Sequence, residues 1–279
     1  MDDQIIFEIL NITVLLAAFG GGIFAASLGI IGAFSISGVM ILVGVAAAAS
    51  GNYDIIGLAF GQYTGPHIAF ASAVAATAYA GRMGLLDSGA DVLTPLAKLK
   101  RFDVLLVGGI FGLFAEICQS FFFVIGLPID TIALTVVISN LLARLIFGKS
   151  GLFGKAPKTI KPFPGWHFMG YNLVLGFGVG LISAYATMIT GDVTIGFGFS
   201  AVTLIFLFYG DFPVTHHISI SAAYAVATTG SLVIGGLFGF VAAAIGTLVW
   251  NLFNTDADTF IDPPAMTIAI TSLFIFTVL

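Results

Sequence analysis

Apolar residues run along this sequence in stretches of about twenty, separated by short polar or glycine-rich breaks. A helix that crosses a membrane needs about 20 largely apolar residues, and ten such runs follow one another. They are residues 5–31, 33–50, 55–81, 104–126, 128–147, 168–190, 193–210, 212–230, 231–252 and 260–279. The pattern predicts an all-α polytopic membrane protein with about ten transmembrane helices.

The composition excludes most other classes of protein. Hydrophobic residues make up 59% of the 279 residues and charged residues only 8%, whereas soluble domains carry about 25% charged residues. This argues against a soluble enzyme, a nucleic-acid binder and a disordered chain. Cys118 is the only cysteine, so an internal disulfide is impossible. The expected partners are the lipid bilayer and a small solute or ion, with no nucleic acid.

The distribution of charge predicts the topology. All nine basic residues lie between Arg82 and Lys161. Because cytoplasmic loops carry the excess of Lys and Arg, we expect the 82–103 segment and the 149–165 linker to face the cytoplasm. The 82–103 segment reads as an amphipathic helix or a loop. We expect an integral protein of a prokaryotic plasma (inner) membrane.

An internal repeat divides the chain. Residues 61–67 (GQYTGPH) match residues 210–216 (GDFPVTH), residues 107–113 match 234–240, and residues 129–139 match 261–271. Three matches in the same order predict two homologous halves, 1–148 and 166–279, joined by the 149–165 linker. The second match is 22 residues closer in sequence than the first, which makes 82–103 an insertion in the first half.

The relative orientation of the halves depends on how many times each crosses the membrane. Five spans per half would invert the second half, as in many secondary transporters, whereas four would leave the halves parallel. The junction Gly230-Ser231 is either a tight turn at the surface or a break within the membrane. We favour inverted five-helix halves; a probe at 254–258 would be cytoplasmic in that arrangement and external in the parallel one.

Polar side chains inside apolar runs are the candidate functional residues, because such residues are costly in a membrane. The primary candidates lie in the third apolar run of each half and around Glu116 in the fourth run. These primary candidates are Gln62, His67, Ser72, Glu116, Gln119, Asp211, His216, His217 and Ser221. Four residues near the start of the fifth run of each half are secondary candidates: Asp130, Thr135, Asp262 and Thr267. The competing interpretation for the two aspartates is helix capping.

Two more specific expectations concern these residues. Glu116 is flanked by apolar residues, and Gln119, one turn later, is its expected neighbour. The segments Gln62–Ser72 and Asp211–Ser221 are expected to meet near the membrane centre and line a pathway, because each contains helix-breaking Gly or Pro, as discontinuous helices at transporter sites do. The competing interpretation is tight helix packing, which also best explains the glycine-rich runs.

These observations favour a membrane transporter or channel for a small solute or ion, with its pathway between the two repeats. The alternative is a non-catalytic membrane subunit of a larger ion-translocating or transport complex. A homo-oligomer or other membrane subunits are further partners to consider. No nucleophile–base pair or dicarboxylate pattern suggests an enzyme, and no motif indicates a cofactor or a metal site.

Overall fold

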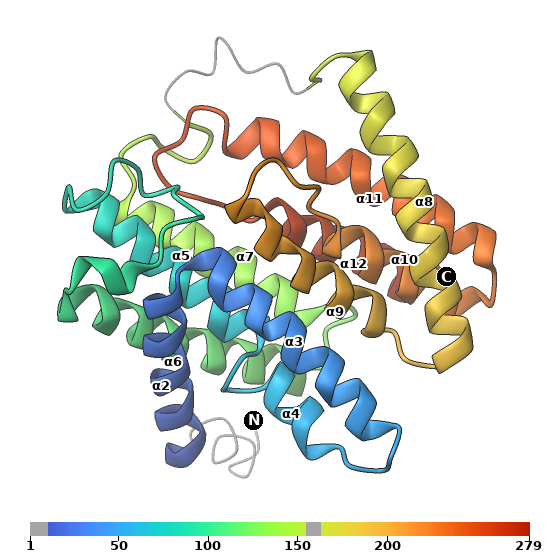
Figure 1. Cartoon of the computed structure of the whole chain (residues 1–279), viewed down its shortest axis with the longest axis horizontal. Coiled ribbons are helices and arrows are strands. Elements are labelled where there is room, and N and C mark those ends of the chain that lie inside the picture. Colours follow the sequence, from blue (N-terminus) through green and yellow to red (C-terminus); the bar gives the residue numbers. More distant parts are fainter. Residues whose placement is uncertain (1–10, 155–162) are drawn as a thin grey trace.

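The computed structural model describes residues 11–154 and 163–279, and within these residues every regular element is a helix (Figure 1). The described residues form eleven α-helices and two short 3-10 helices. The α-helices are α2 (Ile12–Leu28), α3 (Ile30–Ala48), α4 (Asp54–Phe60), α5 (Pro66–Arg82), α6 (Phe102–Val124), α7 (Thr131–Phe147), α8 (Trp166–Thr190), α9 (Ile195–Val202), α10 (His216–Thr229), α11 (Leu232–Phe253) and α12 (Pro263–Val278). The 3-10 helices are η1 (Leu96–Leu99) and η2 (Thr203–Phe208). The all-helical prediction is confirmed.

In the described part of the chain, four helices are long and apolar enough to cross a membrane: α3, α6, α8 and α11. Shorter apolar helices are α2, α7, the α9–η2 segment and α12. The predicted run 55–81 is not one continuous helix, because residues 61–65 separate α4 from α5. The run 212–230 likewise becomes helical only at His216.

The junction between α10 and α11 is a tight turn. Gly230 has a φ of 68°, a left-handed conformation that glycine adopts without steric penalty. Its N–H bonds to the carbonyl of Val226 at 2.8 Å, and Ser231 caps the next helix by accepting from the N–H of Ile234 at 3.4 Å. The two residues therefore reverse the chain by themselves.

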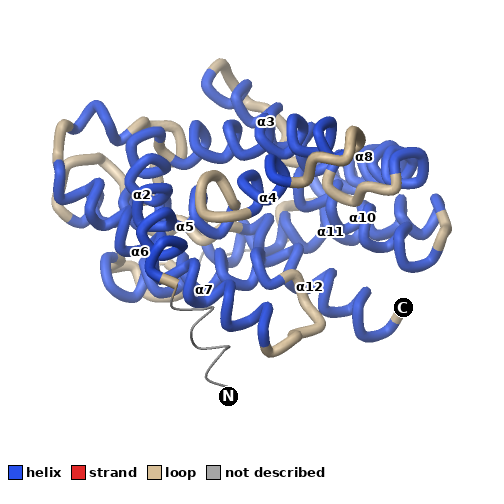
Figure 2. The backbone as a smooth tube through the Cα atoms, turned by 90° about the horizontal axis from the view of Figure 1, so that it is seen from below, coloured by secondary structure: helices blue, strands red, loops and turns tan. Residues whose placement is uncertain are grey.

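Two pairs of crossing helices lie at opposite ends of the molecule, α2 with α6 and α8 with α11 (Figures 1 and 2). Glycines allow the backbones to touch. A Cβ atom on Gly22 of α2 would collide with the carbonyl of Gly108, and one on Gly239 of α11 would collide with that of Gly176. Without side chains between them, the backbones of the paired helices come into direct contact.

Aromatic rings join the two halves of the chain at the centre. Phe34 of α3 lies between Phe70 of α5 and His216 of α10, with ring centroids 5.4 and 4.8 Å away. Phe197 of α9 also packs edge-on against Phe34 at 5.9 Å. Helices α5 and α10 therefore approach one another through the Phe34 ring.

The 82–103 segment forms a loop with a single 3-10 turn, η1, and no amphipathic α-helix. It folds back on the body of the protein. Gly29 leaves room for the carbonyl of Thr94, and Gly89 forms an isolated backbone bridge with Thr259. The segment is thus anchored to both the first and the last part of the chain.

Arg144 ties the end of α7 to two loops. Its guanidinium is buried and donates to the carbonyls of Leu152 and Phe253 at 2.8 and 2.7 Å and to Thr259 Oγ1 at 2.9 Å. Nearby, burial alone would raise the pKa of Asp258, but hydrogen bonds from the Ser150 hydroxyl and from the Lys149 and Ser150 backbone hold that pKa below its usual value. The two loops are therefore bound together.

Candidate functional site

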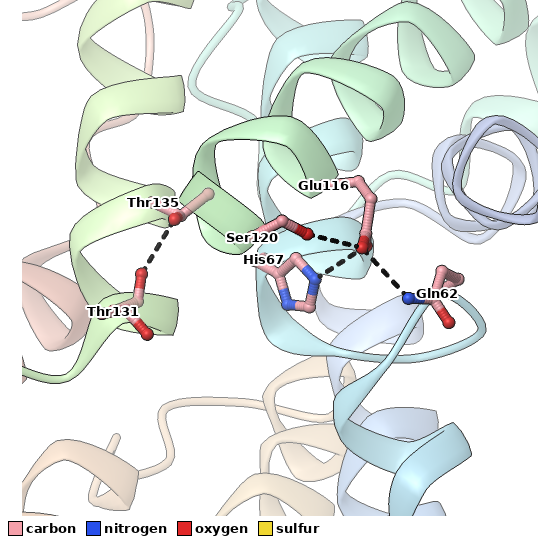
Figure 3. A network of polar contacts seen from close by, with 6 residues as sticks. All are labelled: Gln62, His67, Glu116, Ser120, Thr131 and Thr135. Carbon is pink, nitrogen blue, oxygen red and sulfur yellow. Dashed lines mark hydrogen bonds and ion pairs between the residues drawn. The ribbon is translucent and has the colours of Figure 1, made fainter. Parts of the chain in front are cut away.

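The first polar centre surrounds Glu116, in the middle of α6. Its carboxylate is buried and accepts hydrogen bonds from Gln62 Nε2 at 3.1 Å and Ser120 Oγ at 3.2 Å. His67 Nε2 lies 3.4 Å from the other carboxylate oxygen. Figure 3 shows these side chains converging on the carboxylate from the α4–α5 break, α5 and α6.

The break between α4 and α5 places two of these partners. Pro66 occupies the first turn of α5, where a missing N–H is harmless, and His67 follows it. Gly65 is needed because a Cβ there would lie 2.7 Å from the His67 ring. Gly21 of α2 lets the carbonyl of Gln62 approach the helix closely. Local sequence thus brings Gln62 and His67 to face α6.

The position of Gln119 differs from the one expected from the sequence. Gln119 is not a hydrogen-bonding partner of Glu116; within the described residues its Oε1 has no partner, and its side chain lines a cavity instead. Ser120, one full turn after Glu116, takes the place that Gln119 was expected to fill. Sequence reasoning found Glu116, His67 and Gln62 but missed Ser120, although the i, i+4 spacing was a readable signal.

A first cavity of about 540 Å³ lies beside this centre. It is lined by the end of α6, the start of α7, and faces of α10 and α12. Asp130, which begins α7, caps that helix through the N–H of Ala133 at 2.8 Å and accepts from the Tyr224 hydroxyl at 2.8 Å. The capping interpretation of Asp130 holds, and the residue also lines the cavity.

A second cavity of about 580 Å³ is lined by α8, the end of α11, the start of α12 and residues 211–214. Asp211 is exposed on this segment and is not buried within a helix. His217 lines the cavity as well. Asp262 caps α12 through the N–H of Ala265 at 2.9 Å, as the alternative interpretation expected.

The two cavities share three lining residues: Phe70, His216 and Asp262. All three are buried. Beyond these three residues the two linings differ. Pro66, at the start of α5, lines the first, whereas Val92, beyond the end of α5, lines the second. The pathway expected between Gln62–Ser72 and Asp211–Ser221 stays a prediction, and the structure has two cavities that share three buried lining residues.

The remaining candidates lie in helix contacts and line neither cavity. Ser221 Oγ and Thr271 Oγ1 are 2.7 Å apart, and Thr267 Oγ1 donates to the carbonyl of Pro263 at 2.8 Å. Thr135 bonds to the carbonyl of Thr131 at 2.8 Å in the same way (Figure 3). Ser72 is buried, and its Oγ has no partner within the described residues. For these four the packing interpretation fits best.

The sequence matches a family described as "Family of unknown function (DUF7973)" over residues 4–164 and over residues 158–279. The chain belongs to this family. Its two matched segments together extend over nearly the whole sequence, so the Glu116 centre and both cavities fall inside the family's domain. No curated protein and no solved structure matches the chain.

Proposed function

We propose that this protein is a membrane transport protein that carries a small solute or ion between two cavities on opposite membrane faces. The observation that carries this proposal is the partition of Phe70, His216 and Asp262, on which both cavities end. Volumes of about 540 and 580 Å³ suit small ligands. Because a buried partition separates the cavities, passage requires it to move, as in a carrier or a gated channel.

The antiparallel pairing of two helices supports this proposal. Helices α7 and α12 run antiparallel, since the start of each bonds to the later half of the other: the Asp130 N–H to Ser272 and the Asp262 N–H to Asn140. Two homologous five-helix halves related by a two-fold axis in the membrane plane would produce this pairing. Family matches over both segments are what a duplicated chain would give.

The positive-inside rule then assigns faces to the cavities. Val92 belongs to the basic 82–103 segment and lines the second cavity, so that cavity faces the cytoplasm in a plasma membrane and the first faces outward. Two helices are interrupted near the midplane, as at many transporter binding sites. The interruptions are the α4–α5 break at residues 61–65 and the non-helical segment 209–215 before α10. The Glu116–His67 pair beside the first break is a candidate proton-handling centre.

Cysteine accessibility tests the proposal without knowledge of the solute. In a Cys118→Ser background, we place single cysteines by Gln119→Cys in the first cavity and Thr247→Cys in the second. A membrane-impermeant thiol reagent should modify the first only from outside intact cells and the second only in inverted vesicles. Ile182→Cys, on an exposed apolar face of α8, is the lipid-facing control and should react from neither side.

Modification of both cavity positions from one side would contradict the proposal. Absence of modification from either side would favour the alternative, a non-catalytic subunit whose internal spaces are closed to water. Transport itself is measured in liposomes: His216→Ala should lower flux by more than any fall in the amount of folded protein.

A further inference from the structure

Aspartate side chains line both cavities. Asp130 lines the first cavity, Asp211 the second, and Asp262 both. No Lys or Arg of the described chain lines either one. A charged solute therefore meets carboxylates along the whole route, which attract a cation and repel an anion.

The wall of the first cavity is aromatic. Seven phenylalanines and Tyr224 line it, including Phe34, Phe70 and Phe197 around the partition. Aromatic faces attract cations through their quadrupole, most strongly where water is excluded. Hard cations such as Ca²⁺ and Mg²⁺ take six or more oxygen ligands, which this mainly aromatic and aliphatic wall does not supply. The lining suits a cation that is itself partly hydrocarbon.

Hydrogen-bond acceptors are free at the partition. Asp262 uses Oδ2 to cap α12, and its Oδ1 accepts no hydrogen bond from any described residue. The His216 ring is buried between Phe34 and Phe197 and likewise bonds to no described residue. Asp130 differs, because both of its oxygens already have partners. The free acceptors at Asp262 and His216 can receive N–H donors.

We propose that the first cavity binds a small organic cation, an ammonium group on an apolar or aromatic body. Its charged end lies at Asp262 and His216, and its body lies among the phenylalanine rings. This inference rests on the proposed transport function and names its substrate class. Because the first cavity is lined by Asp130 and Asp262 and by no Lys or Arg of the described residues, a positively charged ligand fits it best.

Three probes of nearly equal shape test the charge preference: benzyltrimethylammonium, its uncharged isostere neopentylbenzene, and the anion phenylmethanesulfonate. Binding to purified protein in detergent is measured by calorimetry, with micelles alone subtracted. The cation should bind at least about ten-fold tighter than the uncharged isostere, and the anion should show no binding. Equal affinity for all three probes, or preference for the anion, overturns the inference.

Asp262→Asn should reduce affinity for the cation by about ten-fold or more, since asparagine still caps a helix but carries no charge. His216→Gln is a second variant that keeps the helix start, and it should weaken binding of a primary benzylammonium probe. Asp87→Asn, at an exposed position outside both cavities, is the charge-matched control and should leave binding unchanged. Undiminished cation binding in both cavity variants overturns the inference.

The outcomes separate the two proposals. Access from opposite faces without a cation preference removes the inference and leaves transport standing. Cation binding with both cavities open to the same face removes transport and leaves a cation-binding membrane protein. Displacement of the organic probe by millimolar sodium or potassium ions would show an inorganic site and overturn the assigned substrate class.

Discussion

The backbone N–H of Asp130 donates a hydrogen bond to Ser272 Oγ at 2.9 Å, although the two residues are 142 positions apart. The reciprocal bond runs from the N–H of Asp262 to Asn140 Oδ1 at 3.0 Å. In the sequence match of 129–139 to 261–271, Asp130 corresponds to Asp262. At the same offset, Asn140 corresponds to Ser272. Equivalent positions therefore exchange equivalent bonds across α7 and α12.

Loss of either acceptor should destabilise this helix pair. Asn140→Ala and Ser272→Ala each leave a helix-start N–H without its partner, which costs about 1–3 kcal/mol of unfolding free energy when the group is buried. The two sites lie roughly 15 Å apart, from ten residues of helix at 1.5 Å each, so their effects should add. Denaturant unfolding in detergent measures the two single variants and the double variant.

Ser139→Ala is the matched control, because the Ser139 hydroxyl is buried with no partner among the described residues. It should change stability by much less than Asn140→Ala on the same helix. If Asn140→Ala and Ser139→Ala unfold alike, the reciprocal bond contributes nothing.

Glycine contacts should be sensitive to a single methyl group. Gly22→Ala and Gly176→Ala place a Cβ against the backbone of α6 and α11 respectively, and we expect overpacking to cost about 1–3 kcal/mol. Gly20→Ala and Gly178→Ala, two residues away on the same helices, meet open space. These should be neutral or stabilise by up to about 1 kcal/mol. Thermal unfolding compares the pairs; equal melting temperatures within a pair would refute the close crossing.

The Glu116–His67 pair should behave as a coupled unit. His67→Ala removes a hydrogen-bonding partner of the buried Glu116 carboxylate, and a buried group left without its partner costs about 1–3 kcal/mol, or more when it is charged. Adding Glu116→Gln to His67→Ala should recover part of that loss, because the uncompensated charge is then gone. A double-mutant cycle of unfolding free energies measures the coupling.

Ser120→Ala provides the comparison within the same centre, since it removes one hydrogen bond to Glu116 and no charge. It should cost about 1 kcal/mol. Strict additivity of the His67 and Glu116 substitutions would mean that the 3.4 Å contact carries no interaction energy.

Arg144→Lys should be strongly destabilising. The guanidinium donates to both loops at once, to the carbonyl of Leu152 in one and to Thr259 Oγ1 in the other. A lysine cannot reproduce the planar fork of donors. We expect a loss of about 3 kcal/mol, in the range for breaking a buried charged network. Arg101→Lys is the control, because Arg101 forms an exposed pair with Asp103 at 2.7 Å, and should change stability by less than about 1 kcal/mol. Equal losses in both variants would show that burial of Arg144 is unimportant.

Several features of the protein follow from local sequence. Long stretches of apolar residues indicate helices, because a helix satisfies its backbone hydrogen bonds within one segment and needs no polar surroundings. The GQYTGPH segment indicates a helix break because glycine and proline disfavour a helix interior. The sequence also indicates that Asp130 and Asp262 are N-caps. Capping is a local interaction, because it joins a side chain to a backbone group three residues away.

Contacts between distant segments were decided only by the tertiary structure. Glu116 was visible as a buried carboxylate, yet its partners Gln62 and His67 lie 54 and 49 residues away, beyond any helical spacing. Phe34 packs between Phe70 of α5 and His216 of α10. Arg144 donates hydrogen bonds to acceptors in two loops. Periodicity reports which face of one helix is apolar, whereas side-chain partners depend on how several helices pack, and that depends on the shape of all of them together.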